Sequence, residues 1–332
     1  MTSERGSLRR VFYETLATLY RSTEYIEVLE YPEKIERQSV NIVVRLHDGR
    51  SVLFKVAYDI EDLTQAEIAE LKSMAAALNA SAAIVARRWG ARELLDSVVY
   101  EKKRIPVITP STLSSILESG SEGVYVYQAK DVFKVRINAE KMRERRLEKK
   151  LSLGDIALHL NTSRKLVYEY ERGLTDPTIE KGEKLVELLG EDVIEPVNPF
   201  ELYDLSEARP RLDFDSDVEA RIASILDNLN FRVTHAKRTA ADIVAGSESA
   251  RMVLLVRHGK ESEARLIRKA DNAYRLSRVV EADAVALIDD PRLKMDLEPA
   301  GLKVYKLEEI DELARELHES RKTSHYREAR RR

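Results

Sequence analysis

The chain has 332 residues, of which 43% are hydrophobic, and a formal net charge of −3, so it is long enough for two or three domains with cores of their own. It contains no cysteine, which excludes disulfides and thiolate metal sites, and no apolar run approaches the ~18 residues that a membrane helix needs. The near-neutral charge argues against a protein that coats nucleic acid in bulk. Binding to nucleic acid would therefore depend on a local basic patch.

Two features of the composition indicate the setting in which the protein works. The first residues, MTSER, do not begin a signal peptide, so we expect a cytoplasmic protein. Charged residues make up 34% of the chain, against three Gln and eight Asn, a shift away from thermolabile amides that is typical of hyperthermophile proteins. We therefore expect the source to be a hot-growing archaeon.

Residues 1–130 are predicted to form an N-terminal α/β domain. Apolar residues recur at helical spacing over 8–21, and Thr64 with Glu67 forms a capping box at the start of a second helix. The dipeptide Asp48-Gly49 lies between two apolar runs and is a hairpin signal. Strands are expected at 25–29, 40–46, 52–57, 82–86 and at the end of the segment 98–108.

Residues 131–194 are predicted to contain four short helices and no strand. In the first, over 139–149, we expect Met142, Arg146 and Leu147 on the inner side. Ser152 opens the second helix, over about 153–160, and Asp155 follows three residues later as a variant of the capping box.

The third helix, over about 164–172, is expected to follow a tight turn at Asn161-Thr162-Ser163. Ser163 can cap this helix, and Val167 and Tyr170 would point inward. A fourth helix starts near Thr178. Two short helices joined by a turn of three or four residues are typical of a helix-turn-helix, in which the second of the two enters the major groove.

The segment resembles the DNA-binding domain of the lambda repressor and Cro family. The resemblance spans about fifty residues, with its anchors at Met142-Arg143, Arg146, Leu151-Ser152, Ile156-Ala157, Asn161-Thr162-Ser163, Val167, Glu171-Arg172-Gly173 and Pro177. The resemblance implies that Arg164, Lys165 and Glu169 read bases, with Arg and Lys on guanine edges and Glu on a cytosine amino group. The further DNA-binding residues that it implies are Ser152, Ser163, Tyr168 and Arg172.

Two residues depart from the family pattern, and a second function stays open. Leu153 stands where many relatives carry a Gln that touches the DNA backbone, and either Tyr168 or Tyr170 could face a partner instead of DNA. The stretch also resembles the multiprotein bridging factor, a protein-binding module. Residues 130–172 hold twelve Lys and Arg against seven Asp and Glu, and this basic balance favours double-stranded DNA as the partner.

Residues 195–215 are predicted to be an extended, proline-containing linker, and residues 216–318 a C-terminal α/β domain. The expected order in that domain repeats the N-terminal one, with helices at 218–229 and 262–277 and strands at 231–234, 242–245, 252–256, 284–288 and 302–305. From Asn41 to Ala82 is 41 positions, and from Asp242 to Ala284 is 42. We therefore interpret the two flanks as copies of one αβ unit with the helix-turn-helix between them.

This αβ unit resembles the restriction-endonuclease-like fold, whose PD-(D/E)xK site needs two carboxylates that hold a divalent ion and a lysine that orients water. In the first copy Asn41 takes the place of the first acid and Leu53 that of the second, which leaves Lys55. In the second copy Asp242 survives. There, Leu254 or Leu255 replaces the other acid, and Val256 or Arg257 the lysine.

We therefore interpret both copies as degenerate scaffolds, with no catalytic residue, no metal site and no cofactor. The sequence predicts a sequence-specific transcriptional regulator that acts without catalysis, as a homodimer on two half-sites about 34 Å apart. The flanking copies would supply the dimer surface, and a small-molecule effector could bind there. The basic tail, 319–332, is expected to be disordered, with contact to phosphates as the functional alternative. The rival from another class is a metal-dependent nuclease that uses Asp242.

Overall fold

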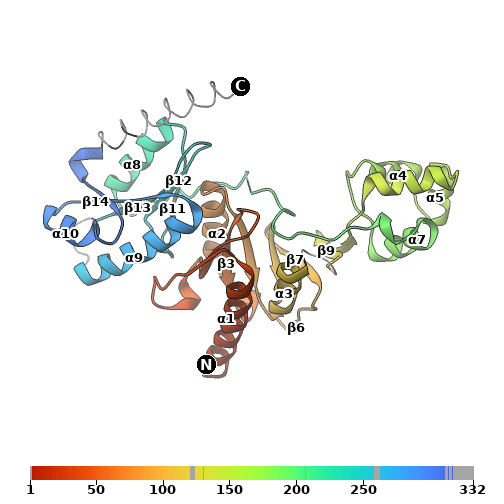
Figure 1. The fold of residues 1–332 in the computed structure, drawn as a ribbon, viewed down its shortest axis with the longest axis horizontal. Coiled ribbons are helices and arrows are strands. Elements are labelled where there is room, and N and C mark those ends of the chain that lie inside the picture. The colour runs from red at the N-terminus through yellow and green to blue at the C-terminus, as the bar shows by residue number, and fades with distance from the viewer. Residues whose placement is uncertain are drawn as a thin grey trace. The chain divides into compact units, whose positions relative to one another are not determined.

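The computed structural model describes residues 2–119, 124–129, 131–205, 207–257 and 262–310, together with 313 and 316. The chain forms two compact units, Met1–Ala83 with Asp204–Arg332, and Ile84–Tyr203 (Figure 1). These limits do not coincide with the expected domain limits, because the N-terminal αβ segment packs with the C-terminal one. None of the described helices has both the length and the apolarity needed to cross a bilayer. The basic tail lies outside the described residues.

The first unit contains two αβ copies, and the first copy begins at the N-terminus. Its sheet has the strand order β1-β2-β3-β4, and the pairs β1-β2 and β2-β3 are antiparallel. Gly49, with φ +83°, lies in the predicted hairpin turn, and Thr64 and Glu67 form the predicted capping box. The elements are α1 (Thr2–Ser22), β1 (Tyr25–Val28), β2 (Ile42–Arg45), β3 (Ser51–Val56), α2 (Gln65–Ala77) and β4 (Ser81–Val85).

The second copy repeats this order near the C-terminus. Its sheet has the order β11-β12-β13-β14-β15, in which the first two pairs are antiparallel and the last two are parallel. Its core consists of residues from α8, from the four strands β11 to β14 and the residue before β11, and from the chain after β15. The elements are α8 (Asp217–Asn228), β11 (Arg232–His235), β12 (Ile243–Gly246), β13 (Arg251–Val256), α9 (Glu263–Val280), β14 (Asp283–Ile288), α10 (Lys294–Leu297) and β15 (Lys303–Lys306).

The two copies pack on each other reciprocally within one chain. Helix α2 of the first copy lies against β11 and β12, and α9 of the second copy lies against β1 and β2. At the end of β12, a Cβ on Gly246 would come 1.6 Å from the carbonyl oxygen of Ala77 in α2. At the end of β2, the Arg45 side chain donates to the carbonyl oxygen of Val279 in α9. Each strand end therefore meets the C-terminal end of the other copy's helix.

The second unit joins a small sheet to the helical segment. The end of β4 pairs in parallel with β8, and the strand order continues β8-β7-β9-β10. The last strand, β10, lies within residues 131–194, so the expectation that this segment contains no strand is wrong at its start, where the chain pairs with β9. The sequence reading missed the β7-β8 turn, because Lys103 and Arg104 adopt positive φ without the Gly or Asn that marks such turns. The elements are β5 (Arg88–Trp89), β6 (Arg92–Glu93), β7 (Val98–Lys102), β8 (Ile105–Ile108), α3 (Pro110–Ser119), β9 (Val126–Ala129), β10 (Val132–Val135), α4 (Ala139–Glu148), α5 (Leu153–His159), α6 (Arg164–Glu171) and α7 (Ile179–Leu189).

The expected linker is extended, but it is packed over much of its length. In the second unit, Val197 donates its N–H to the carbonyl oxygen of Val124, and both Val197 and Phe200 are buried. In the first unit, Arg211 forms an ion pair with Glu70 on α2, with 2.7 Å between Nη1 and Oε2. The prolines keep this segment out of helices and sheets, whereas the segment's apolar side chains are still buried in the cores of the two units.

Candidate nucleic-acid interface

An ion pair fastens α4 to the end of α6. Arg146 on α4 reaches Glu171 with two parallel hydrogen bonds, 2.5 Å from Nε to Oε1 and 3.0 Å from Nη2 to Oε2. Both side chains are largely buried, and Arg146 also donates to the carbonyl oxygen of Leu151. The carboxylate of Glu171 raises the pKa of Arg146. A bidentate, shielded pair of this kind fixes the orientation of α6 as well as its position.

Helix α5 starts with the predicted variant of the capping box. The Ser152 hydroxyl accepts from the N–H of Asp155 at 3.1 Å, and the Asp155 carboxylate accepts from the N–H of Ser152 at 2.7 Å. The hydrogen bond from the Ser152 backbone lowers the pKa of Asp155. Asp therefore performs the role that Glu or Gln usually has, because its shorter side chain still reaches the cap N–H.

The turn between α5 and α6 also follows the sequence prediction. Asn161 has φ +48°, in the left-handed region that asparagine tolerates, and the N–H of Thr162 returns to the carbonyl oxygen of Ala157 at 2.9 Å. Ser163 then caps α6, with its hydroxyl accepting from the N–H of Leu166 at 3.1 Å. These local hydrogen bonds set the angle at which α6 leaves α5.

Helix α6 separates its buried residues from its exposed ones. Val167 and Tyr170 point into the core between the four helices, as predicted. Tyr168 is 47% exposed, so of the two tyrosines it is the one that faces outward. The members of that core are Ile137, Met142, Ile156, Ala157, Leu160, Val167, Tyr170, Leu185, Leu189 and Val193.

The residues predicted to contact DNA lie on the outward side of this segment. Arg164, the first residue of α6, is exposed, and the Lys165 side chain is 84% exposed. Glu169 is partly exposed and lies 3.9 Å from the Lys165 ammonium. Arg172 lies over the ring of Tyr168, with 5.7 Å from its Cζ to the ring centroid. The caps Ser152 and Ser163 are exposed as well.

Gly154 on α5 lies against the Arg164 side chain, a contact that was not predicted from the sequence. A Cβ on Gly154 would lie 2.9 Å from Nε and 3.0 Å from Nη2 of Arg164. The guanidinium of Arg164 therefore lies across the bare backbone of α5. The signal in the sequence was a glycine inside a predicted helix, which commonly marks a close approach.

One inward prediction on α4 is wrong. Leu147 is 57% exposed, whereas Met142 and Arg146 point inward as expected. Leu147 and Arg146 are neighbours in a helix, and the ion pair to Glu171 turns the side of α4 that carries Arg146 toward α6. Consecutive helical positions lie about 100° apart, so Leu147 is rotated toward solvent.

Asp176 ties the β9-β10 hairpin to the helical segment. Its carboxylate accepts from the Tyr127 hydroxyl at 2.6 Å and from the N–H of Ile137 at 3.0 Å. Burial and the neighbouring carboxylate of Asp176 raise the pKa of Tyr127. The sequence reading missed this role, because Asp176 precedes a proline and reads locally as an ordinary turn residue.

The nuclease-like position of the first copy holds an amide instead of an acid. The Asn41 side chain accepts from the N–H of Val56 at 2.7 Å and donates to Ile35 and Gln38. Leu53 is fully buried in β3. Two residues on, the Lys55 ammonium lies 3.2 Å from the Glu67 carboxylate, and both side chains are buried.

The second copy keeps the acid but neutralises it. Asp242 accepts from the N–H of Val256 at 2.8 Å, which matches the bond from Val56 to Asn41. In this shared register Val253 is equivalent to Leu53, and Leu255 is equivalent to Lys55. The predicted assignments of Leu254 or Leu255 to the second acid, and of Val256 or Arg257 to the lysine, were therefore out of register.

The other oxygen of Asp242 forms an ion pair with Lys269 of α9. The alignment of the two copies could not be predicted from their apolar strand residues, because these residues resemble one another. Only the backbone hydrogen bond to Asn41 or Asp242 identifies the equivalent positions. In the part of the chain that the structure describes, no group of three or more His, Asp or Glu residues could hold a metal ion.

Comparison with known families agrees with both resemblances. A family model described as a PD-(D/E)XK superfamily domain matches residues 9–122, and a model described as helix-turn-helix matches residues 142–195. The mixed α/β fold with a PD-(D/E)XK-like N-terminal domain and a helix-turn-helix is thereby confirmed. No solved structure matches the chain.

Relatives of similar length occur in several archaea. A protein of Aeropyrum pernix is 37% identical over 291 residues, which cover 86% of this chain and 87% of that protein. A protein of Pyrococcus furiosus is 28% identical and covers 81% and 87% of the two chains, and one of Saccharolobus solfataricus is 24% identical and covers 93% and 97%. All three are named as HTH-type transcriptional regulatory proteins.

Proposed function

Since the chain belongs to the family of archaeal HTH-type transcriptional regulatory proteins, we propose that it recognises specific sites on double-stranded DNA with α6 in the major groove. The observation that carries this proposal is that α6 has one buried side and one exposed, basic side. Val167 and Tyr170 hold the helix in the core, while the arginine and lysine of its first turn remain exposed. An outward basic N-terminal turn is what base reading requires.

We assign direct base contacts to Arg164, Lys165 and Glu169. Arginine and lysine donate to guanine O6 and N7, and a carboxylate accepts from a cytosine amino group. The 3.9 Å pair between Lys165 and Glu169 is loose and exposed, so it costs little to open when bases replace it.

Ser152, Ser163, Tyr168 and Arg172 are assigned to phosphate or sugar contacts, which position the protein on the duplex. All four are exposed.

We infer that the αβ copies act as scaffolds without catalysis. The PD-(D/E)XK match at residues 9–122 favours a nuclease as the second candidate. Against it stand the amide of Asn41 and the buried Leu53 in the first copy. In the second copy, the ammonium of Lys269 already neutralises Asp242. Incubation of the protein with plasmid DNA and Mg²⁺ or Mn²⁺ should leave the plasmid intact, and cleavage would overturn this inference.

We also propose that two chains bind together, on half-sites one helical turn apart. A single helix-turn-helix reads few base pairs, so affinity normally comes from a dimer. The dimer surface that we expected from the flanking copies is partly used within the chain, where α2 and α9 each cover strands of the other copy. A homodimer would therefore need another surface, and light scattering on the free and DNA-bound protein tests the stoichiometry.

Selection of bound fragments from the source genome tests the proposed function. Full-length protein is incubated with sheared genomic DNA at ~0.15 M salt, because binding to phosphates depends strongly on salt. We expect a short sequence to be enriched, repeated at a spacing of about one helical turn if two chains bind together. If no sequence is enriched, sequence-specific regulation is rejected and a protein-binding role, as in a bridging factor, takes its place.

A further inference from the structure

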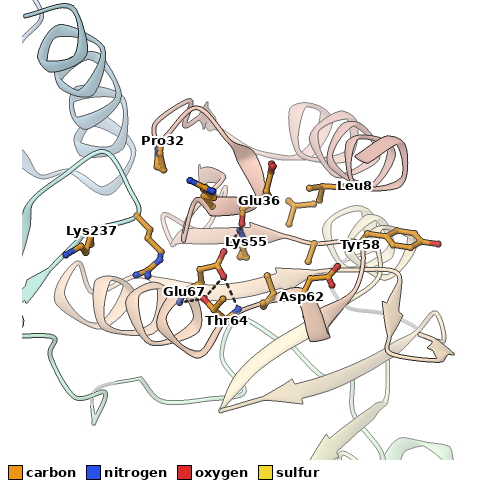
Figure 2. Close-up of a pocket in the computed structure, with 14 residues that line it drawn as sticks. Leu8, Pro32, Glu36, Lys55, Tyr58, Asp62, Thr64, Glu67 and Lys237 are labelled. Atoms are coloured by element: carbon orange, nitrogen blue, oxygen red, sulfur yellow. Dashed lines mark hydrogen bonds and ion pairs between the residues drawn. The ribbon is translucent and has the colours of Figure 1, made fainter. Parts of the chain in front are cut away.

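A cavity of about 800 Å³ lies in the first unit, between the first αβ copy and one loop of the second copy (Figure 2). We call it the interface cavity. Its volume lies within the range of about 300–1,000 Å³ that is typical of small-molecule sites. The lining residues are Leu8, Pro32, Glu36, Arg37, Lys55, Val56, Ala57, Tyr58, Asp62, Leu63, Thr64, Glu67, Lys237 and Arg238.

One end of the interface cavity is closed by polar residues, of which Lys55 and Glu67 are buried. Figure 2 shows Lys55, Glu67 and Thr64 together there, and Glu67 accepts from both the N–H and the hydroxyl of Thr64. The Lys55 ammonium also donates to the carbonyl oxygens of Ile35, Glu36 and Gln38. Burial lowers the pKa of Lys55, while the Glu67 carboxylate opposes that shift. This end is rigid, and its two charges compensate each other.

The rim of the interface cavity carries cations from both copies. Arg37 comes from the first copy and is exposed, and within the described part of the chain its guanidinium has no carboxylate at ion-pair distance. Arg238 comes from the second copy. Its Nη1 lies 3.9 Å from Glu70, a carboxylate that already accepts from Arg211 at 2.7 Å. Two guanidinium groups, one from each copy, therefore remain able to bind the same anion.

The walls of the interface cavity are largely apolar. The apolar lining residues are Leu8 of α1, Pro32, Val56 at the end of β3, Ala57 after it, and Leu63, which precedes the cap of α2. A groove that follows a nucleic-acid backbone presents a row of cations and stacking aromatics instead. Tyr58, the aromatic residue in this lining, directs its ring away from Lys55 in Figure 2. The lining suits a compact ligand with an apolar body better than a strand of DNA.

We propose that the interface cavity binds a small organic anion, a carboxylate or phosphate on an apolar body, whose anionic group is held by Arg37 and Arg238. Such a ligand contacts both copies at once and stabilises their packing. The second copy cannot form the same polar end, because Leu255 stands where the first copy has Lys55. The ligand's role as an effector rests on the proposed regulatory function, whereas its binding does not.

The test uses the full chain without DNA and the fluorescent probe 8-anilinonaphthalene-1-sulfonate, an organic anion with an apolar body. We expect saturable binding of one probe per chain. N-phenyl-1-naphthylamine, which has the same apolar body without the sulfonate, should bind at least about 10-fold more weakly, since charge-assisted hydrogen bonds are among the strong ones. Equal binding of the two probes would overturn the proposal.

Two variants locate the probe. Arg37→Ala should weaken sulfonate binding about 10-fold, whereas the matched control Arg221→Ala, an exposed arginine on α8, should leave it unchanged. Leu63→Trp, at a partly exposed lining position, should narrow the cavity and weaken binding while circular dichroism remains that of the folded protein. Full binding in Arg37→Ala, or in folded Leu63→Trp, would place the probe elsewhere and refute the assignment.

Competition identifies the ligand class. Displacement by adenosine monophosphate would indicate a phosphate ligand, and displacement by 3-phenylpropionate a carboxylate ligand. If neither displaces the probe at millimolar concentration, or if a DNA oligonucleotide alone does so, a small-molecule site is rejected. Because no step uses an operator, failure here leaves the proposed DNA recognition untouched.

Discussion

The charged residues at the nuclease-like positions of the αβ copies differ in burial and pairing from those in the first turn of α6. In the copies, Lys55 is paired with Glu67 and Lys269 with Asp242, and these side chains are buried or nearly so. On α6, Arg164 and Lys165 are exposed, and the nearest carboxylate to the lysine is 3.9 Å away. A cation that is paired and buried inside the chain cannot reach an outside anion, whereas an exposed one can.

The same contrast explains why a nuclease-like fold is compatible with a regulator. The metal of a PD-(D/E)xK site would need carboxylates that are free to bind it. In the second copy an ammonium group of α9 holds the surviving carboxylate, and in the first copy an amide has replaced it. The five predictions below test this contrast, in order of decreasing effect.

Replacing Lys55 should have the largest effect on stability. Lys55→Leu gives the first copy the residue type of Leu255 and leaves Glu67 buried without its cation. Removing one partner of a buried ion pair typically costs about 3–5 kcal/mol of the free energy of unfolding, which urea denaturation would measure. The double variant Lys55→Leu/Glu67→Gln should recover most of the loss. A loss below about 1 kcal/mol in the single variant would show that the pair is not structural.

Lys269→Met should destabilise the protein less, by about 2–3 kcal/mol, because Asp242 and Lys269 are somewhat more exposed than Lys55 and Glu67. The double variant Lys269→Met/Asp242→Asn is the control and should unfold at nearly the wild-type urea concentration. Neither variant should cleave plasmid DNA, since Val253 still replaces the second acid. Cleavage by Lys269→Met would show that the lysine masks a working nuclease site.

Arg164→Ala and Lys165→Ala should each weaken operator binding by about 1–3 kcal/mol and change the free energy of unfolding by less than about 0.5 kcal/mol. Fluorescence anisotropy with the selected operator measures the first quantity, and urea denaturation the second. Unchanged affinity in both variants would reject α6 as the recognition helix.

Arg164→Lys separates base reading from simple charge attraction. It keeps the charge and loses the planar, bidentate guanidinium, so specific binding should fall while binding to random DNA stays the same. If Lys165 contacts a phosphate instead of a base, Lys165→Ala would lower the salt dependence of binding by about one unit and weaken all sequences equally.

Gly154→Ala should have the smallest effect, with opposite signs in the two assays. The new Cβ displaces Arg164, which should weaken operator binding by about 0.5–1 kcal/mol, the usual cost of an off-rotamer side chain. Alanine stabilises a helix interior relative to glycine by roughly 0.5–1 kcal/mol, so resistance to urea should rise or stay level. Tighter operator binding would contradict the position assigned to Arg164.

Sequence patterns predicted the five strands and the two longer helices of the second copy to within about three residues, although they missed the short α10, and they predicted the caps of the helical segment in detail. The signals at Ser152, Asn161 and Ser163 involve hydrogen bonds between residues no more than five positions apart, so their meaning is set by local geometry. The apolar spacing of Val167 and Tyr170 likewise determined which side of α6 is buried. This locality is why the candidate interface could be predicted without coordinates.

Other features depend on contacts between distant residues, which no local pattern encodes. Lys269 lies 27 positions after Asp242, and only the placement of α9 brings the two together. The exposure of Leu147 followed from an ion pair with Glu171, and the alignment of Val253 with Leu53 from a backbone hydrogen bond.

The sequence alone determined that this chain carries a helix-turn-helix with an outward basic first turn, because helix caps and apolar periodicity act within a few residues. Tertiary structure decided that the two αβ copies cover each other's strands, that Lys55 and Asp242 are neutralised by Glu67 and Lys269, and that a cavity lies between the copies. Those outcomes depend on how surfaces far apart in the chain fit together, and burial determines which charges must be paired.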